Sequence, residues 1–466
     1  MNTLLRNANV VDVRTGDVRR GVDIETADGR IAAIGEGGSA AASSAGVDLA
    51  GAYVVPGYND MHAHTLQLDD PSGAYRLMLA HGVTGYRQMA GSPQLLARRA
   101  AGGFPDTVDA PALLLLPGDL LTPLNAASPE AVREEVRRQH AQGADFVKMA
   151  FIAGSVYPAA QEEANRVGIP LGGHLPGPIP AEEASRLGIG FIEHLGPGLG
   201  LLSSCNHDHA AIHEQLAAEK PMRLPRFPGA GKLFAKLIPR IVVNPSLRTS
   251  AETVAMMRRA VDAFDEDRVR ALAAVLAENG TWQCATLVRV RASQLSDEPA
   301  WAENPALRYM SEATLKFWDR TLERYRRLPA STREVFRELY AAQLRLVRLL
   351  DEGGVPMIAG SDVTGAIWLV PGESLHREFD ELAGAGIPPL RVLQMTTLDA
   401  ARFAGADDLG LVEPGYRADL VVLDADPTAD VSAMHRVSGV VRAGRYRDRA
   451  ELDRMLEGVA AERSGG

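Results

Sequence analysis

The sequence predicts an α/β protein built on a (β/α)8 TIM barrel, with a small β-sandwich domain formed from both termini. Two observations predict this fold class. Between about residues 57 and 407, short apolar strands alternate with helical stretches, which is typical of a parallel sheet covered by helices. The two ends of the chain instead contain short strands separated by turns, as in small β domains. Eight central strands favour a barrel, and an open parallel sheet is the alternative.

The predicted β-sandwich domain covers residues 1–56 and 408–447. Turn-forming segments with glycine, such as Thr15-Gly16-Asp17 and Ala27-Asp28-Gly29, separate its apolar runs. Residues 448–466 are expected to form a C-terminal helix or tail. The expected strands of this domain are Leu4–Val13, Val18–Thr26, Ile31–Ile34, Ala52–Val55, Asp419–Asp424 and Val437–Ala443.

The predicted barrel covers residues 57–407. Two intervals between its strands are longer than one barrel helix requires, so we expect helical insertions at about 200–280 and 288–352. They would lie over the carboxyl ends of the strands, as a lid or as contacts in a homo-oligomer. The helices expected in them are Glu252–Glu278, Ala306–Leu328 and Ser331–Glu352. The eight strands are Asp60–His64, Val83–Met89, Ala112–Leu116, Phe146–Phe151, Pro170–His174, Phe191–His194, Trp282–Leu287 and Pro356–Asp362.

Composition excludes several classes of partner. The chain has 466 residues and a formal net charge of −10, and an acidic chain without a basic run is a poor match for nucleic acid. Its two cysteines, Cys205 and Cys284, are too far apart for a disulfide framework or a CxxC metal motif. No apolar stretch approaches the ~18 residues that a membrane helix needs, and the N-terminus does not resemble a signal peptide. We therefore expect a cytoplasmic protein without nucleic-acid or membrane partners.

Histidine and aspartate side chains gather at the ends of the predicted strands. His62 and His64 are two residues apart, so on a strand both imidazoles face the same way. His174, His194 and Asp362 end three later strands. In a parallel barrel these ends lie on one face, where active sites are built. A packed histidine would explain His174 alone, but the joint placement of all five side chains indicates a metal site.

Lys148 is unusual in its position. It lies within the apolar strand Phe146–Phe151, where an unpaired ammonium is costly to bury. The chain has 44 Arg and 5 Lys, and Arg would serve an ion pair equally well, so the choice of lysine indicates that its amine chemistry matters. A lysine whose charged end reaches solvent at the strand end is the alternative. A neutral amine can take up carbon dioxide to become a carbamate, whose two oxygens can bridge two cations.

These motifs, in this order, resemble those of the amidohydrolase superfamily. The resemblance covers nearly the whole chain outside the two insertions. It is greatest to the imidazolonepropionase-like group, in its lysine-containing branch with two metal ions, which includes Xaa-Pro dipeptidases. The segments that carry it are Pro56–His64, Gly143–Lys148, Gly173-His174, Glu193-His194, Gly360–Asp362, Thr396–Arg402 and Gly410–Asp424.

The resemblance implies a set of metal ligands. One divalent ion would be held by His62, His64 and Asp362, and a second by His174 and His194. Lys148, carboxylated by CO2, would bridge the two. Imidazole and carboxylate ligands suit Zn2+ best, and Mn, Fe or Co would also fit.

The resemblance also implies a reaction. A metal-bridging hydroxide would attack the amide carbonyl of a small substrate such as a dipeptide or an N-acyl amino acid, with a free carboxylate next to the scissile bond. Asp362 would take the proton of the water and pass it to the leaving nitrogen. The alternatives are a hydrolase of a cyclic amide, a lactone or ester, or an organophosphate, and a metal-binding protein without catalysis.

Four further features are weaker candidates. Tyr157 follows the Lys148 strand and Arg289 follows the seventh strand, so either would be placed to contact substrate, although an ordinary loop aromatic and an exposed arginine explain them as well. Asp60 shares the parity of His62, and we expect it to support the site rather than to bind metal. The cluster of Cys205, His207, His209 and His213 resembles a second metal site, but a solvated lid segment is the favoured interpretation.

Overall fold

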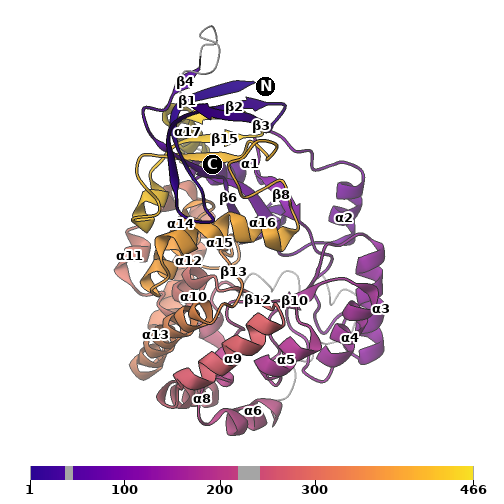
Figure 1. Ribbon diagram of the computed structural model, residues 1–466. Helices are drawn as coiled ribbons and strands as arrows, with labels where there is room; N and C mark the ends of the chain where they lie inside the picture. Colours follow the sequence, from indigo (N-terminus) through magenta and orange to yellow (C-terminus); the bar gives the residue numbers. More distant parts are fainter. Residues whose placement is uncertain (1, 37–45, 219–241, 465–466) are drawn as a thin grey trace.

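The structure is a computed structural model that describes residues 2–36, 46–218 and 242–464 (Figure 1). Eight strands form one sheet at one end of the molecule, near both termini. Its hydrogen-bonded order is β16-β15-β14-β5-β1-β2-β3, and β4 pairs with β1. The strands are β1 (Thr3–Val11), β2 (Val18–Ala27), β3 (Arg30–Glu36), β4 (Val47–Asp48), β5 (Tyr53–Pro56), β14 (Leu420–Leu423), β15 (Val437–Arg442) and β16 (Arg445–Asp448).

The two ends of the chain meet within this sheet. β14 runs antiparallel to β5, and Leu420 lies opposite Pro56 while Leu423 lies opposite Tyr53. Apolar side chains from both ends, among them Leu5, Val54 and Leu420, pack in one shared core. The strands form one continuous series, so the division into the two layers of a sandwich stays a prediction.

The central strands form two parallel sheets. One has the order β6-β7-β8 and the other the order β13-β12-β11-β10-β9, with parallel neighbours throughout. Isolated parallel bridges link the sheets, from Ala63 to Val363 and from Leu121 to Met149. This α/β arrangement is consistent with a TIM-barrel type. The strands are β6 (Tyr58–Ala63), β7 (Val83–Gln88), β8 (Ala112–Leu115), β9 (Val147–Met149), β10 (Leu171–Gly173), β11 (Phe191–Glu193), β12 (Trp282–Cys284) and β13 (Met357–Ile358).

Each of the eight predicted central strands overlaps an observed one, and β12 and β13 end furthest before their predicted carboxyl ends. β12 ends at Cys284 because Thr286 adopts a left-handed conformation, with φ of 44°, and a helix starts at Leu287. β13 ends at Ile358, and Asp362 likewise has a positive φ of 60°. The chain therefore leaves the sheet before the predicted strand ends, which turns these side chains over the ends of the strands.

Helices surround the parallel strands and occupy both predicted insertions. The first insertion contains α6, α8 and α9, and the second α10 to α13. The helices are α1 (Ser72–Ala80), α2 (Pro93–Ala100), α3 (Pro129–Ala141), α4 (Tyr157–Val167), α5 (Ala181–Leu187), α6 (His209–Ala218), α8 (Ala251–Asp262), α9 (Glu266–Glu278), α10 (Leu287–Gln294), α11 (Pro299–Ala302), α12 (Glu312–Arg326), α13 (Ala330–Glu352), α14 (Glu373–Gly384), α15 (Pro389–Thr396), α16 (Leu398–Ala404) and α17 (Arg449–Ser464).

The predicted single helix at Glu252–Glu278 is wrong in one respect. It consists of α8 and α9, because the side chain of Asp265 caps α9 by accepting hydrogen bonds from the backbone N–H groups of Asp267 and Arg268. Similarly, α12 begins after its cap Ser311, later than predicted, and a short 3-10 turn at Pro305–Tyr309 precedes it. Within the described residues, no helix combines the length and apolar character that crossing a bilayer requires.

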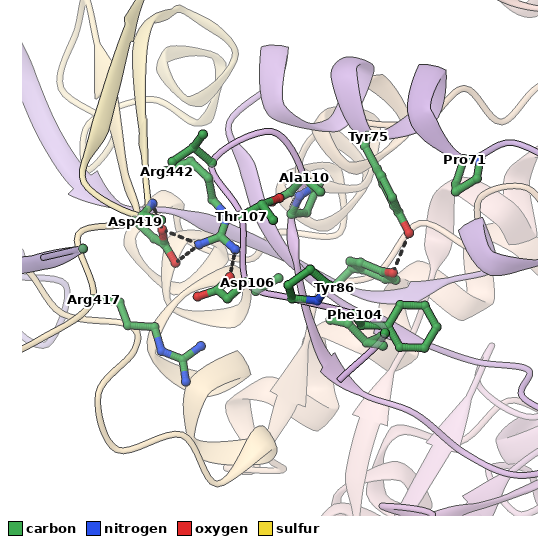
Figure 2. Close-up of a pocket in the computed structure, with 18 of the residues that line it drawn as sticks. Pro71, Tyr75, Tyr86, Phe104, Asp106, Thr107, Ala110, Arg417, Asp419 and Arg442 are labelled. Atoms are coloured by element: carbon green, nitrogen blue, oxygen red, sulfur yellow. Dashed lines mark hydrogen bonds and ion pairs between the residues drawn. The ribbon is translucent and has the colours of Figure 1, made fainter. Parts of the chain in front are cut away.

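Arg442 connects the terminal sheet to the central strands. Its fully buried guanidinium donates from Nη1 to both carboxylate oxygens of Asp419, at 2.9 and 3.1 Å, and from Nε to the carbonyl of Ala110 at 2.8 Å. It also pairs with Asp106 at one end of a cavity of about 780 Å³, and Tyr75 and Tyr86 line the other end (Figure 2). A bridging guanidinium thus fixes how the sheet sits on the segment before β8.

Replacing Arg442 with Ala is expected to destabilise the fold. The variant leaves the buried Asp419 carboxylate without its cation, which costs about 3–5 kcal/mol in buried pairs. Urea unfolding followed by circular dichroism measures the loss. Arg436→Ala, at an exposed position, is the control and should change the free energy of unfolding by no more than about 0.5 kcal/mol. Equal stability of the two variants would contradict a structural role for the Arg442 contacts.

Candidate metal centre

The side chains predicted to bind metal come from five of the parallel strands or from the residues that directly follow them. His62 lies in β6 and Lys148 in β9, while His174 and His194 directly follow β10 and β11. Asp362 follows β13, and its backbone N–H donates to the carbonyl of His62 at 2.8 Å. The strands run parallel, so all these groups lie at the carboxyl ends of the strands.

The carboxylate of Asp362 is at the centre of the cluster. Its Oδ1 lies 3.2 Å from Nε2 of His62 and 3.1 Å from Nε2 of His64. Its Oδ2 lies 3.8 Å from Nε2 of His194. Nζ of Lys148 is 3.3 Å from Nε2 of His62. Three of the predicted histidine ligands therefore surround the buried carboxylate, and Lys148 contacts one of these histidines.

His174 joins the cluster through its ring. The centroid of its imidazole lies 5.3 Å from that of His194, and the His194 centroid lies 4.6 Å from that of His62. Phe151 packs edge-on against His174 on another side, with centroids 5.7 Å apart. The structure thus places the sixth predicted ligand beside the other five.

Three of the imidazoles are held by a hydrogen bond at Nδ1. Nδ1 of His62 is 2.6 Å from Oε2 of Glu193, Nδ1 of His194 is 2.5 Å from Oγ1 of Thr286, and Nδ1 of His174 is 2.9 Å from the carbonyl oxygen of Ala150. Metal-binding histidines in proteins almost always use one ring nitrogen in this way, which fixes the ring and leaves the other nitrogen for the ion. The arrangement leaves Nε2 of each ring as the candidate ligand atom.

Asp60 fixes the backbone under the centre. Its Oδ1 accepts hydrogen bonds from the N–H of His62 at 3.1 Å and from the N–H of Ser361 at 3.0 Å, and its Oδ2 accepts from the Ser361 hydroxyl at 2.5 Å. One buried carboxylate thus ties the residue before Asp362 to His62. This is the supporting role that the sequence predicts for Asp60.

Burial changes the protonation of the cluster. It lowers the pKa of Lys148 to about 8, against the opposing effect of Glu193 and Asp362. Burial and the nearby Lys148 lower the pKa of His174 to about 3, and burial also lowers the pKa of His64 and His194. Neutral imidazoles and a partly neutral amine are the forms that bind metal and carbon dioxide.

Asp362 behaves in the opposite way. Burial by itself opposes its ionisation, but the charges of His62 and His194 and hydrogen bonds to the histidines hold its pKa well below the ordinary range. The carboxylate is therefore ionised at neutral pH. A carboxylate oxygen among imidazole nitrogens is a donor set that suits divalent ions such as zinc.

The geometry of the donor atoms fits a metal ion. Ligand atoms of His62, His194 and Asp362 all lie within 4.8 Å of one another, and all three residues are buried. A second group with this spacing contains His62, Glu193 and Cys284. In that group Glu193 is already paired with Nδ1 of His62, and burial raises the pKa of the Cys284 thiol well above its usual value, so this group is the weaker candidate.

Arg289 lies beside the centre, as a substrate-binding candidate should. It occupies the first turn of α10, is largely buried, and donates from Nε to Oδ2 of Asp362 at 2.8 Å. Its guanidinium is thus within reach of any ligand bound at the metal centre.

Tyr157 does not face the centre, so its prediction as a substrate residue is wrong. It begins α4, its side chain is fully buried, and its hydroxyl donates to the carbonyl of Ala184 in α5 at 3.2 Å. Helix α4 begins at Tyr157, directly after the loop that follows the Lys148 strand. The ring of Tyr157 therefore lies between α4 and α5 and not over the ends of the strands.

The second candidate cluster does not assemble as a metal site in the described part of the chain. Cys205 is fully buried, whereas His207 is exposed and pairs with Asp265 at 3.1 Å. Nε2 of His213 lies 3.4 Å from the Ser204 hydroxyl. The side chains point to different partners, so these residues do not form a second metal site, and the interpretation of the segment as a solvated lid stays a prediction.

Sequence reasoning missed Glu193 and Arg87. Both are fully buried, and Nη2 of Arg87 lies 2.5 Å from Oε1 of Glu193. The available signal was a charged residue inside an apolar strand, the same signal that identified Lys148. Burial opposes the ionisation of Glu193, but Arg87 and His62 lower its pKa to about 2.

Known proteins with similar sequences match this chain in part. Residues 337–447 match the family described as Amidohydrolase family. An adenine deaminase of Methanothrix thermoacetophila is 36% identical over 87 residues, which cover 17% of this chain and 14% of that protein. An adenine deaminase of Sinorhizobium fredii is 54% identical over 41 residues, which cover 9% and 7%. The aligned segments span only a small part of these curated relatives.

Solved structures match over almost the full length. A Bottromycin amidohydrolase has a TM-score of 0.72 at 24% identity and covers 99% of this chain and 90% of its own. A Xaa-Pro dipeptidase with bound methionine in the active site has a TM-score of 0.60 at 17% identity, with 96% and 100% covered. At these identities the likeness shows a shared fold. Together, the family match over residues 337–447 and the shared fold support the resemblance to the amidohydrolase superfamily.

Replacing Tyr157 with Phe tests the corrected placement. The variant loses hydrogen bonds to α5 and within α4, so we expect it to be less stable by about 0.5–1.5 kcal/mol in urea unfolding. Its metal content, measured by elemental analysis, should equal that of the wild type. A reduced metal content with unchanged stability would show that the ring acts at the centre after all.

Proposed function

We propose that this chain is a metal-dependent amidohydrolase, built on a closed (β/α)8 barrel, that hydrolyses the amide bond of a small substrate such as a dipeptide or an N-acyl amino acid. The observation that carries the proposal is the buried convergence of His62, His64 and His194 on Asp362, with Lys148 in contact. Such a cluster at strand carboxyl ends has the composition and position of a hydrolytic metal centre.

The ligands divide into two groups. His62, His64 and Asp362 would hold one divalent ion, with zinc as the first choice, and His174 and His194 would hold the second. Lys148 would join them as a carbamate, for which its lowered pKa supplies the neutral amine. The bound ions would act as Lewis acids for the scissile carbonyl and would acidify a water molecule.

Asp362 is the proposed proton carrier. Its ionised carboxylate can accept the proton of the attacking water and deliver it to the leaving nitrogen. Arg289 would bind the free carboxylate of the substrate, since its guanidinium lies next to Asp362 and presents planar N–H donors. In this proposal the scissile bond lies beside Asp362, and the free carboxylate of the substrate lies near Arg289.

The choice of substrate class is supported by the similar structures. They include a Xaa-Pro dipeptidase with bound methionine and a prolidase complexed with n-methylphosphonate-l-proline. Hydrolysis of a cyclic amide, an ester or an organophosphate is the alternative for the same centre. Deamination is a second candidate, because curated relatives with local similarity are named adenine deaminases.

Metal analysis tests the centre. Protein purified without added metal should contain about two divalent ions per chain. Lys148→Ala should retain about one and lose at least about 100-fold in kcat/KM, with partial recovery when a short carboxylate is added, because the bridge between the ions is gone. Lys316→Ala, which removes an exposed lysine paired with Glu312, is the matched control and should change neither value. Two ions and full activity in Lys148→Ala would overturn the bridging role.

A substrate screen tests the reaction. Dipeptides and N-acyl amino acids should be hydrolysed, and Arg289→Met should lower kcat/KM about 10–100-fold, as expected for a lost hydrogen bond to a charged group. The loss should be smaller with substrates whose carboxylate is amidated, because only the effect of the missing Arg289–Asp362 hydrogen bond then remains. Arg291→Met is the control, because Arg291 lies on the same helix but pairs with Glu298 and Glu381. Turnover of lactones, cyclic amides or adenine without any turnover of dipeptides would contradict the proposed substrate class.

A further inference from the structure

Arg87 is a charged residue in the interior of the parallel strands. It lies in β7, and none of its surface is exposed to solvent. Burying a guanidinium costs several kcal/mol unless partners replace its water. The position is too far inside for solvent to supply them, so the contacts of Arg87 must explain why it is there.

Its contacts lead to the metal centre. Nε donates to the carbonyl oxygen of Met61 at 2.6 Å, and Met61 directly precedes His62. Nη2 donates to Oε1 of Glu193 at 2.5 Å. The other carboxylate oxygen of Glu193 lies 2.6 Å from Nδ1 of His62. One guanidinium therefore holds His62 twice, through its backbone neighbour and through the carboxylate that fixes its ring.

Aromatic rings complete the surroundings of the guanidinium. The rings of Phe146, Phe191 and Phe403 have centroids 5.6, 5.0 and 4.7 Å from its central carbon. Nη1 has no hydrogen-bond partner among the described residues, so cation–π contacts supply the remaining stabilisation. A lysine has no planar fork to bond Glu193 and Met61 together while packing against three rings.

His62 differs in this respect from His174 and His194. The Nδ1 atoms of His194 and His174 contact a neutral hydroxyl and a backbone carbonyl, whereas Nδ1 of His62 contacts a buried carboxylate. A carboxylate partner makes the imidazole a stronger ligand and fixes its tautomer. The two groups of ligands are thus supported unequally.

We propose that Arg87 is a positioning residue for the metal centre: by bonding Glu193 and the Met61 carbonyl, it holds the carboxylate against Nδ1 of His62 and keeps Nε2 directed at the ion. This inference rests on the proposed function, since it assigns a role within the same centre. Without Arg87, the Glu193 carboxylate is a buried charge with no cation, and its position against His62 is no longer fixed.

The test is metal affinity, which requires no substrate. Metal-free protein is titrated with Zn2+ in competition with a chromophoric chelator, and folding is checked by circular dichroism. In Arg87→Met and Glu193→Gln, the affinity for one of the two ions should fall about 10–100-fold, the effect typical of lost partners behind metal ligands. The other ion should bind as in the wild type. Arg87→Lys should fall between Arg87→Met and the wild type.

The chain offers matched controls in its second buried pair. Arg442 and Asp419 form a comparable ion pair in the terminal sheet, away from the centre. Arg442→Met and Asp419→Asn should lower stability and leave both zinc affinities unchanged. An equal loss of zinc affinity in these controls would overturn the proposal, because it would assign the effect to general destabilisation.

The remaining outcomes also decide the question. Unchanged zinc affinities in Glu193→Gln would overturn the positioning role, and this variant decides if Arg87→Met fails to fold, because it preserves the shape of the side chain. If wild-type protein binds no zinc, the proposed function itself fails. If the wild type binds two ions and both Arg87→Met and Glu193→Gln bind them with wild-type affinity, only this inference fails.

Discussion

The burial of the Asp362 carboxylate among imidazole rings is the constraint on which the rest of the centre depends. A buried charge without partners is unstable, so every neighbouring group must either pair with it or stay neutral. His62, His64 and Arg289 supply the pairing. The same burial keeps the other imidazoles neutral and lowers the pKa of Lys148 to about 8. The properties that suit the site to metal and carbon dioxide therefore have one physical origin.

The backbone around Asp362 is arranged to meet this constraint. β13 ends early, and a positive φ at Asp362 turns its side chain over the strand ends. Asp60 then ties Ser361 and His62 together, so that the aspartate and its first histidine partner cannot move apart independently. The site thus requires that the strand end early, because in a longer strand the Asp362 side chain would not turn over the strand ends.

Much of this architecture could be predicted from the sequence because it is local. The alternation of strands and helices and the parity of His62 and His64 depend only on neighbouring residues. The Arg87–Glu193 pair joins residues 106 positions apart, and no local pattern specifies which buried charges meet. The predicted role of Tyr157 failed for a related reason. Tyr157 does follow the Lys148 strand closely, but α4 begins at this residue, and the helix decides where its ring points. The break between α8 and α9 could have been predicted, because Asp265 followed by Glu266 and Asp267 is typical of a helix start. The apolar pattern continues through this position and hid the break.

Charged residues inside apolar strands are the signal that unites the informative positions. Lys148, Arg87 and Glu193 are all buried in strands, and each contacts His62 or the partner of His62. Arg442 and Asp419 show that a buried pair can also serve the fold alone, where it joins the terminal sheet to the segment before β8. The distinction between the two roles lies in what else the carboxylate contacts: the backbone N–H of Ala443, next to β15, for Asp419, and the ring of a metal-binding candidate for Glu193.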